Sequence, residues 1–172
     1  MTKKAKASAS KKAGASKKAS TSKKAGASRM ERGQPERKLP GWMADHLQRY
    51  LATNGADGHV WRGVPTLLLT TTGSRSGEPR LLPLIYGRDG DRYVVVASKG
   101  GAPDHPAWYT NLVASPEVTL QVGAAKFRAR ARTANRDERP RLWKLMTRIW
   151  PAYDQYQATT QREIPVVLIE RH

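Results

Sequence analysis

Hydrophobic and polar positions divide the chain into two parts. From residue 2 to residue 29 no large apolar side chain occurs, so this stretch cannot bury enough surface to offset the cost of ordering it. After Pro40 the apolar residues recur first at helical spacing, and then in short β-branched runs bounded by Gly, Pro, Asn and Asp. The pattern predicts a disordered tail and linker over residues 1–38 and one folded domain over residues 39–172.

The folded domain is predicted to begin with an amphipathic helix over Gly41–Asn54. Trp42, His46 and Tyr50 follow one another at helical spacing, and Asn54-Gly55 is typical of a helix C-terminus. We expect this helix to lie across the mouth of the substrate site. Core packing is one role for Trp42, and contact with lipid or a quinone is the other.

Three apolar runs between residues 66 and 97 predict a β-meander. The strands are expected at Thr66–Thr72, Arg80–Tyr86 and Tyr93–Ala97, with a tight loop at residues 73–77 and a hairpin turn at residues 88–91. In a meander the first and third strands flank the second. The loop after the first strand and the residues after the third are therefore expected at one end of the sheet.

Both of these segments carry groups that bind anions. The first loop offers Arg75, Arg80 and two hydroxyls, and the third strand runs into Ser98-Lys99-Gly100-Gly101. Cations, hydroxyls and unhindered backbone N–H groups beside apolar strands suit a flat ring that carries negative charge. The sequence thus predicts a cofactor pocket at this end of the sheet.

The second half of the domain predicts two helices, a hairpin and a last strand. A short helix opens at Pro106, where Trp108, Tyr109 and Leu112 share a buried face and Asn111 points elsewhere. The remaining elements are strands 117–122 and 126–133, whose arginines 128, 130 and 132 form a solvated face, a helix over residues 137–150 and an apolar strand at residues 165–169. With six strands and three helices, the chain is predicted to be a mainly β, α+β protein built on a small barrel.

Charge separates the tail from the body. Residues 1–40 carry ten Lys and three Arg against two Glu, a balance of +11, whereas residues 41–172 carry a balance of +6. The tail is similar to the lysine- and alanine-rich tails of histone-like bacterial proteins, and it suits a DNA backbone or an anionic membrane surface. A solubilising extension without a partner is the alternative.

Residue types missing from the sequence narrow the chemistry. The chain has no cysteine, and its four histidines show no metal-ligand spacing, so we expect no metal centre. It also has no apolar run long enough to span a membrane and no apolar core of a secretory signal. We expect a cytoplasmic protein, which the tail is able to hold at the inner face of the cell membrane.

Three segments together resemble the deazaflavin-dependent nitroreductase and quinone reductase family of actinobacteria. They read TTTGSRSGEPRLLPLIY, ASKGGAPDHPAWYTNL and WPAYDQYQ followed by REIPVVLIER, and the resemblance extends from Trp42 to Arg171. The resemblance implies a split β-barrel of the flavin-reductase type and the cofactor coenzyme F-420, an 8-hydroxy-5-deazaflavin. It implies hydride transfer to a menaquinone-like quinone, a nitroaromatic compound or an activated enone.

The resemblance also assigns residues. By carry-over the coenzyme is bound by residues of the first loop, the second strand, the exit of the third strand and the short helix: Ser74, Arg75, Ser76, Arg80, Leu81, Leu82, Pro83, Leu84, Ile85, Val96, Ala97, Ser98, Lys99, Ala107, Trp108, Tyr109, Thr110 and Asn111. Tyr153 is implied to orient the acceptor and assist its protonation, and Tyr156 to gate it. Trp150 stands where nitro-activating relatives carry a tyrosine, and Ile85-Tyr86 replaces a tyrosine-phenylalanine pair. Both departures bear on the choice of acceptor.

Two other functions remain open at this point. A split barrel can bind FMN instead of a deazaflavin, and the basic tail can make the chain a nucleoid-associated DNA-binding protein.

Overall fold

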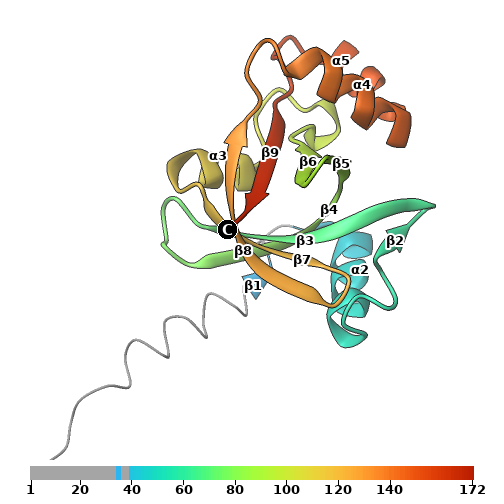
Figure 1. The fold of residues 1–172 in the computed structure, drawn as a ribbon, viewed down its shortest axis with the longest axis vertical. Helices are drawn as coiled ribbons and strands as arrows, with labels where there is room; N and C mark the ends of the chain where they lie inside the picture. Colours follow the sequence, from blue (N-terminus) through green and yellow to red (C-terminus); the bar gives the residue numbers. More distant parts are fainter. Residues whose placement is uncertain (1–33, 36–38) are drawn as a thin grey trace, which may run out of the picture.

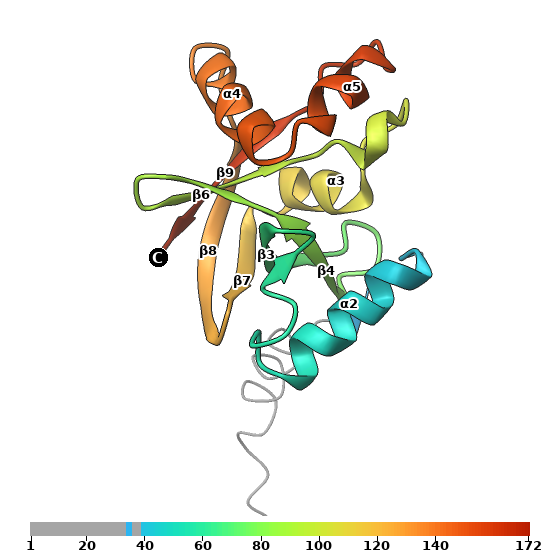
Figure 2. The same cartoon turned by 90° about the vertical axis from the view of Figure 1, so that its right-hand side faces the viewer.

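A mainly antiparallel sheet curls on itself and carries helices at two ends (Figures 1 and 2). The structure is a computed structural model, and it describes residues 34–35 and 39–172 of the chain. The strands are β1 (Gln34–Pro35), β2 (Val60–Trp61), β3 (Val64–Thr72), β4 (Pro79–Ile85), β5 (Gly87–Asp89), β6 (Arg92–Val96), β7 (Glu117–Val122), β8 (Ala125–Thr133) and β9 (Val166–Arg171). The helices are α2 (Gly41–Ala52), α3 (Ala107–Ala114), α4 (Arg139–Ile149) and α5 (Ala152–Ala158), with a 3-10 turn η1 (Lys99–Gly101).

One continuous stretch of chain forms β4, next to one end of the strand order, and β5, at the other end. The strand order is β1-β4-β3-β7-β8-β9-β6-β5, and β2 pairs with β3. Because β4 and β5 are separated only by Tyr86, the chain passes from the strand beside β1 to the strand at the opposite end of the order within a single residue. The sheet is therefore a split barrel, as the resemblance implied. All ladders are antiparallel except the two-residue pairing of β1 with β4.

The close packing of α4 on β5 depends on a glycine. A Cβ atom added at Gly87 would lie 2.8 Å from Met146 Sδ and 2.9 Å from Ile149 Cδ1. These are contacts that a real side chain does not make, so the absence of a side chain at Gly87 lets α4 pack directly on β5.

The predicted meander was wrong in its pairing. β6 pairs with β5 and β9, while β4 has β3 and β1 as its neighbours, so the first and third predicted strands do not both flank the second. The reason is that the hairpin is formed by β5 and β6, after the ladder of β4 has ended at Ile85. All six predicted strands are present. The structure adds the short strands β1, β2 and β5, and a fourth helix, α5, in a stretch for which no helix was predicted.

The strands alternate between two covered faces. Leu67 and Leu69 of β3 belong to the core inside the barrel. Leu68, between them, points the opposite way and packs with Leu47 and Tyr50 of α2. Because both faces are covered, the strand reads as a continuous apolar run, and each buried leucine contributes about 1.5–3 kcal/mol.

A second core lies beneath α4 and α5. Val94 and Val96 of β6 pack there with Leu142 and Met146, whereas Val95 points into the barrel. Figure 2 shows α4 and α5 at one end of the molecule and α2 at the other, with the barrel between them. This arrangement leaves room for a site between α2 and α5.

Tyr50 fixes α2 against the sheet. Its buried hydroxyl accepts a hydrogen bond from the Gly123 N–H at 2.8 Å and lies 3.3 Å from the Thr66 carbonyl oxygen, which can accept its proton. Gly55, just beyond the helix, comes so close to Gly123 that an added Cβ would lie 2.6 Å from backbone atoms. The helix is thus tied to both the β3 and the β7–β8 parts of the barrel.

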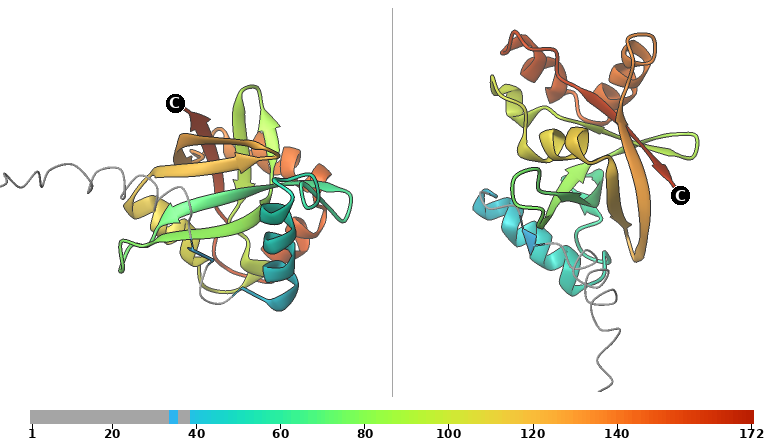
Figure 3. Two further views of the ribbon diagram at one scale, coloured as in Figure 1. Left: turned by 90° about the horizontal axis from the view of Figure 1, so that it is seen from below. Right: turned by 90° about the vertical axis from the view of Figure 1, so that its left-hand side faces the viewer.

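The outer face of β8 is charged, as predicted. Arg128, Arg130 and Arg132 are all exposed. Arg130 forms an ion pair with Glu117 at 2.6 Å, and Arg132 forms one with Glu138 at 2.7 Å. Carboxylates therefore neutralise part of this positive strand. The left panel of Figure 3 shows the barrel from below, with the C-terminal strand β9 running beside β8.

Candidate active site

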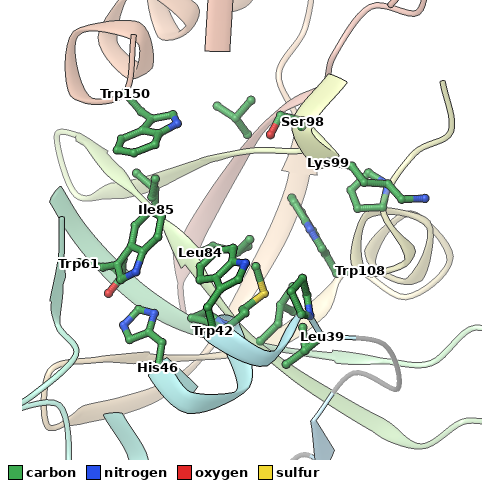
Figure 4. A pocket seen from close by; sticks show the side chains of 18 of the residues that line it. Leu39, Trp42, His46, Trp61, Leu84, Ile85, Ser98, Lys99, Trp108 and Trp150 are labelled. Atoms are coloured by element: carbon green, nitrogen blue, oxygen red, sulfur yellow. The ribbon is translucent and has the colours of Figure 1, made fainter. Parts of the chain in front are cut away.

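A cleft of about 770 Å³ opens between α2 and the end of the molecule that carries α4 and α5 (Figure 4). Its walls come from α2, β2, β4, the exit of β6, the start of α3 and the α4–α5 connection. It is lined by Leu39, Pro40, Trp42, Met43, His46, Trp61, Arg62, Thr66, Leu82, Pro83, Leu84, Ile85, Val96, Ser98, Lys99, Gly100, Pro106, Ala107, Trp108, Trp150, Tyr153 and Tyr156. Most of these side chains are apolar or aromatic, as in sites that bind planar organic molecules.

Backbone amides and a cation form one side of the cleft. Lys99, Gly100 and Gly101 have φ angles of 46°, 62° and 81°, and Ser98 before them is in the right-handed helical region. A right-handed residue followed by left-handed ones turns successive N–H groups toward one point, which is an anion-binding arrangement. Lys99 is the unusual residue, because a side chain makes a positive φ costly by ~1–2 kcal/mol.

Only some of the backbone N–H groups of this turn form hydrogen bonds within the protein. The Gly101 N–H donates to the Ser98 carbonyl at 2.9 Å and the Ala102 N–H to the Lys99 carbonyl at 3.2 Å. The N–H groups of Ser98, Lys99 and Gly100 donate to no acceptor among residues 34–35 and 39–172. Ser98, Lys99 and Gly100 all line the cleft, and the Lys99 side chain is exposed, so this side can hold an anion.

Aromatic rings form the other side. Trp42 of α2 stacks on Trp61 of β2 with ring centroids 5.0 Å apart and an interplanar angle of 19°. Trp61 in turn lies 5.6 Å from Trp150, at the end of α4. Figure 4 shows Trp61 and Trp150 across the cleft from Lys99 and Trp108. Trp42 is 51% exposed, an unusual position for a side chain with so much apolar surface.

Tyr153 and Tyr156 of α5 both reach the cleft, as the resemblance implied. Their rings make an edge contact with centroids 6.1 Å apart. Burial raises the pKa of Tyr153, so its phenol stays protonated at any physiological pH. Its hydroxyl makes no hydrogen bond within the described part of the chain and is therefore free to donate one to a molecule in the cleft.

About half of the predicted coenzyme residues line the cleft. These are Leu82, Pro83, Leu84, Ile85, Val96, Ser98, Lys99, Ala107 and Trp108. Leu81 alternates with its neighbours and packs on the α2 side with Leu47. The side chain of Ala97 is buried in the barrel core, and the Tyr109 hydroxyl bonds Thr133 Oγ1 at 2.9 Å. The Thr110 hydroxyl donates to the Ala107 carbonyl of its own helix.

Asn111 was expected to point away from the buried face of α3, and this was wrong. Its side chain is buried, with Oδ1 accepting from the Ser74 N–H at 3.0 Å and Nδ2 donating to Thr71 Oγ1 at 3.1 Å. Helical spacing alone could not predict this, because the Ser74 N–H that Asn111 binds lies in a loop 37 residues earlier in the sequence.

The β3–β4 loop lies beside the cleft and not in its wall. Ser74, Arg75 and Ser76 are exposed, and Arg80 donates weakly to Ser76 Oγ at 3.4 Å. Asn111, which holds the Ser74 amide, stands one helical turn after Trp108, which lines the cleft. The two predicted polar clusters are thus neighbours across α3.

Sequence reasoning missed several cleft residues. Trp61 belongs to a two-residue strand without periodicity, and His46 was expected only as part of a helix face. The His46 Nε2–H donates to the Gly58 carbonyl at 2.6 Å, and its ring lies 6.3 Å from that of Trp61. Arg162, which does not line the cleft but binds carbonyl groups of its wall, stood inside a recognised motif and had no assigned role.

Comparison with known proteins identifies the class of this split-barrel protein. The model of a family described as F420H(2)-dependent quinone reductase matches residues 42–171. The chain therefore belongs to this family of oxidoreductases, which depend on reduced coenzyme F-420. It is 44% identical over 130 residues to the F420H(2)-dependent quinone reductase of Mycobacterium tuberculosis, covering 73% of this chain and 87% of that protein.

Solved structures agree with this result. A structure of an F420-H2 dependent reductase (FDR-A) has a TM-score of 0.58 and 43% identity, over 62% of this chain and 94% of that one. Another, described as a domain-swapped dimer, has a TM-score of 0.61 and 38% identity, over 74% and 93%. The predicted family, split barrel, enzyme class and cofactor are confirmed.

The cleft fits this cofactor on its own geometry. Coenzyme F-420 combines a flat ring with a phosphate and a glutamate chain, and the cleft combines apolar walls with uncommitted amides and a lysine.

Among the residues described, no three His, Asp or Glu side chains gather in a way that could hold a metal. No helix in that part of the chain has the length and hydropathy needed to cross a bilayer.

Proposed function

We propose that the cleft binds the coenzyme and its acceptor on opposite sides. The turn at Ser98–Gly100 takes the anionic part of the coenzyme, Leu82–Ile85 and Trp108 contact its ring, and the acceptor lies toward Tyr153 and the tryptophans. The observation that supports this most is the pairing of uncommitted amides on one side with an uncommitted phenol on the other. When bound, the reduced coenzyme supplies the hydride.

On the coenzyme side the protein contributes mainly electrostatic interactions with an anion. Three amides and Lys99 face one anion, and each charge-assisted contact contributes ~1.5–3 kcal/mol. Arg75, Ser74 and Ser76 lie beyond α3 and are proposed to meet the phosphate or the glutamates further along the coenzyme's chain, with Arg80 continuing that basic surface. Their place beside the cleft wall suits a long ligand that leaves the cleft there.

On the acceptor side Tyr153 acts as a hydrogen-bond donor. A neutral phenol stabilises negative charge that develops on a carbonyl or nitro oxygen, and a raised pKa excludes its use as a base. Tyr156 closes the same wall and is proposed as the gate. Trp61, with Trp42 and Trp150 against it, offers a flat apolar surface for the ring of a quinone.

Two residue replacements in the cleft bear on the choice of acceptor. Ile85 and Trp150, which replace tyrosines of nitro-activating relatives, line the cleft, but Tyr86 is buried in the barrel core. Two phenol groups are thus replaced by apolar surface in the cleft, and one of the two positions, Trp150, lies on the acceptor side. We infer a preference for a menaquinone-like quinone over nitroaromatic compounds and enones.

A direct assay tests this function. The purified protein is mixed with reduced coenzyme F-420 and menadione, and the coenzyme's absorbance and fluorescence are followed over time. We expect oxidation of the coenzyme that depends on both protein and quinone, and slower turnover with a nitroaromatic compound or an enone. Absence of turnover with every acceptor would remove the proposal, and tight FMN binding by a yellow protein would favour the flavin alternative.

The basic segment 1–30 lies outside the described residues, and its partner remains a prediction. We propose that it holds the enzyme at an anionic membrane surface, where menaquinone-like acceptors are found, with DNA as the competing partner. Flotation with anionic vesicles, compared with duplex DNA binding at equal salt, separates the two. A chain lacking residues 1–30 is the control, and equal behaviour of both chains would contradict either partner.

A further inference from the structure

Arg162 holds the turn at Ser98–Gly100 from behind. Its Nε–H donates to the Ala102 carbonyl at 2.8 Å, and an Nη2–H donates to the Ser98 carbonyl at 2.8 Å. Longer contacts of 3.3 Å join both Nη atoms to the Ala97 carbonyl. One guanidinium therefore binds carbonyl groups on both sides of the turn, before and after the three residues with positive φ.

His105 completes this set. Arg162 Nη1 lies 3.1 Å from His105 Nδ1, and because guanidinium nitrogens only donate, Nδ1 accepts and carries no proton. His105 also contacts the ring of Tyr109, with centroids 4.9 Å apart. Arg162 and its hydrogen bonds therefore form a clamp. The clamp reaches from Ala97, just after β6, to His105, the residue before Pro106 at the start of α3.

The hydrogen-bond partners of Arg162 are neutral, and the carboxylate of Asp104 acts on its charge without forming an ion pair. These partners are carbonyl oxygens and an imidazole nitrogen, and no carboxylate of the described residues forms an ion pair with Arg162. The side chain is also half-buried, so a lysine in its place could not satisfy the same fan of acceptors. A guanidinium with no ion-pair partner among the described residues, placed behind an anion-binding turn, adds to the positive field that the anion experiences.

We propose that Arg162 is a positioning residue that holds the Ser98–Gly100 turn in its strained, amide-exposing shape and thereby sets the affinity for the coenzyme. This inference rests on the proposed function of the cleft. Arg162 lies between α5 and β9 and does not line the cleft, so it acts through the turn and not by contact. Lys99 keeps its positive φ because the carbonyls on either side of it are fixed.

A conservative substitution tests the clamp. Arg162→Lys keeps the charge and removes the forked donors. We expect the affinity for the coenzyme, measured by fluorescence titration without an acceptor, to fall about tenfold or more. In turnover assays the KM for the coenzyme should rise while kcat at saturation stays near the wild-type value. Hydrogen exchange at the Gly101 and Ala102 amides should become faster in the coenzyme-free protein.

Arg139 provides a matched control. It too is a half-buried arginine that binds a carbonyl, that of Ile164 at 2.9 Å, and it contacts the same α5–β9 connection without reaching the turn. Arg139→Lys should leave the coenzyme affinity within about twofold of wild type. An equal loss in both variants, or an unchanged affinity in a folded Arg162→Lys protein, would overturn the inference.

A milder variant covers the case in which Arg162→Lys does not fold. His105→Phe keeps a ring against Tyr109 at an exposed position and removes only the Nδ1 acceptor. It should weaken coenzyme binding about two- to threefold and speed exchange of the same two amides, and no change in either would contradict the clamp. Failure of the proposed function looks different, because wild-type protein itself would then not bind the coenzyme.

Discussion

The two sides of the cleft are built by different means. The anion-binding part of the coenzyme side is a backbone structure, made by the stretch from Val96 to Trp108 and fixed by positive φ angles and carbonyl contacts. The acceptor side is made of side chains from α2, β2, the end of α4 and α5, and one of them, Trp42, is 51% exposed. The cofactor is thus met by a rigid shape and the acceptor by a broad aromatic surface.

This difference has a chemical reason. A fixed set of amides recognises one constant anion and gains from having no freedom to lose on binding. Stacked aromatic rings bind planar molecules of different shapes, so they suit a range of acceptors. We therefore expect substitutions on the coenzyme side to cost more than those on the acceptor side.

The largest effect is expected where the two sides touch. An added Cβ at Gly101 would lie 2.6 Å from the Tyr156 carbonyl oxygen and closer still to Thr159 Oγ1, at a φ of 81°. Gly101→Ala should lower the free energy of unfolding in urea by roughly 2–4 kcal/mol and displace α5. Gly100→Ala is the control, since its φ is similar but nothing lies within 4 Å, and it should cost only about 1 kcal/mol. Similar losses in both variants would show that contact with α5 is unimportant.

Loss of a cation on the coenzyme side comes next. Lys99→Ala should weaken coenzyme binding about tenfold to a hundredfold without unfolding the protein, because one charge-assisted contact is lost. Arg75→Ala should have a comparable effect only if the chain of the coenzyme passes over α3 to the β3–β4 loop. Fluorescence titration measures both, and Lys144→Ala, on the exposed face of α4, controls for net charge. Wild-type affinity in Lys99→Ala would place the anion site elsewhere.

A smaller loss, confined to turnover, is expected at Tyr153. Tyr153→Phe should lower kcat with menadione roughly tenfold and leave the affinity for the coenzyme nearly unchanged, because only the hydrogen bond to the acceptor disappears. Tyr93→Phe removes a phenol hydroxyl that is outside the cleft and should have little effect. If Tyr153→Phe weakened coenzyme binding instead, the division of the cleft into two sides would be incorrect.

The smallest effect is expected on the aromatic wall. Trp61→Leu should raise the KM for a quinone about two- to tenfold, since stacking partners contribute ~0.5–1.5 kcal/mol beyond the area that they bury. The coenzyme affinity of the same variant serves as the internal control. An unchanged KM for every quinone tested would mean that acceptors bind away from Trp61.

The coenzyme side was largely predictable from the sequence, and the acceptor side was not. Ser98-Lys99-Gly100-Gly101 after an apolar run already indicated free amides and a cation, and the structure places three of these residues in the cleft. Trp61 gave no signal, because a two-residue strand has no period to detect. The role of Arg162 was hidden for a related reason, since its acceptors are carbonyls about 60 residues earlier in the chain.

The sequence by itself determined the strands, the long helices, the turn that exposes its amides and the membership of a reductase family. These depend on local patterns of apolar residues, glycines and charges. The tertiary structure alone decided that β6 pairs with β5 and β9, that Asn111 is buried, and that Arg162 stands behind the turn. The physical reason is that these arrangements depend on contacts between segments far apart in the sequence, and a local pattern of residues does not record which distant segments become neighbours.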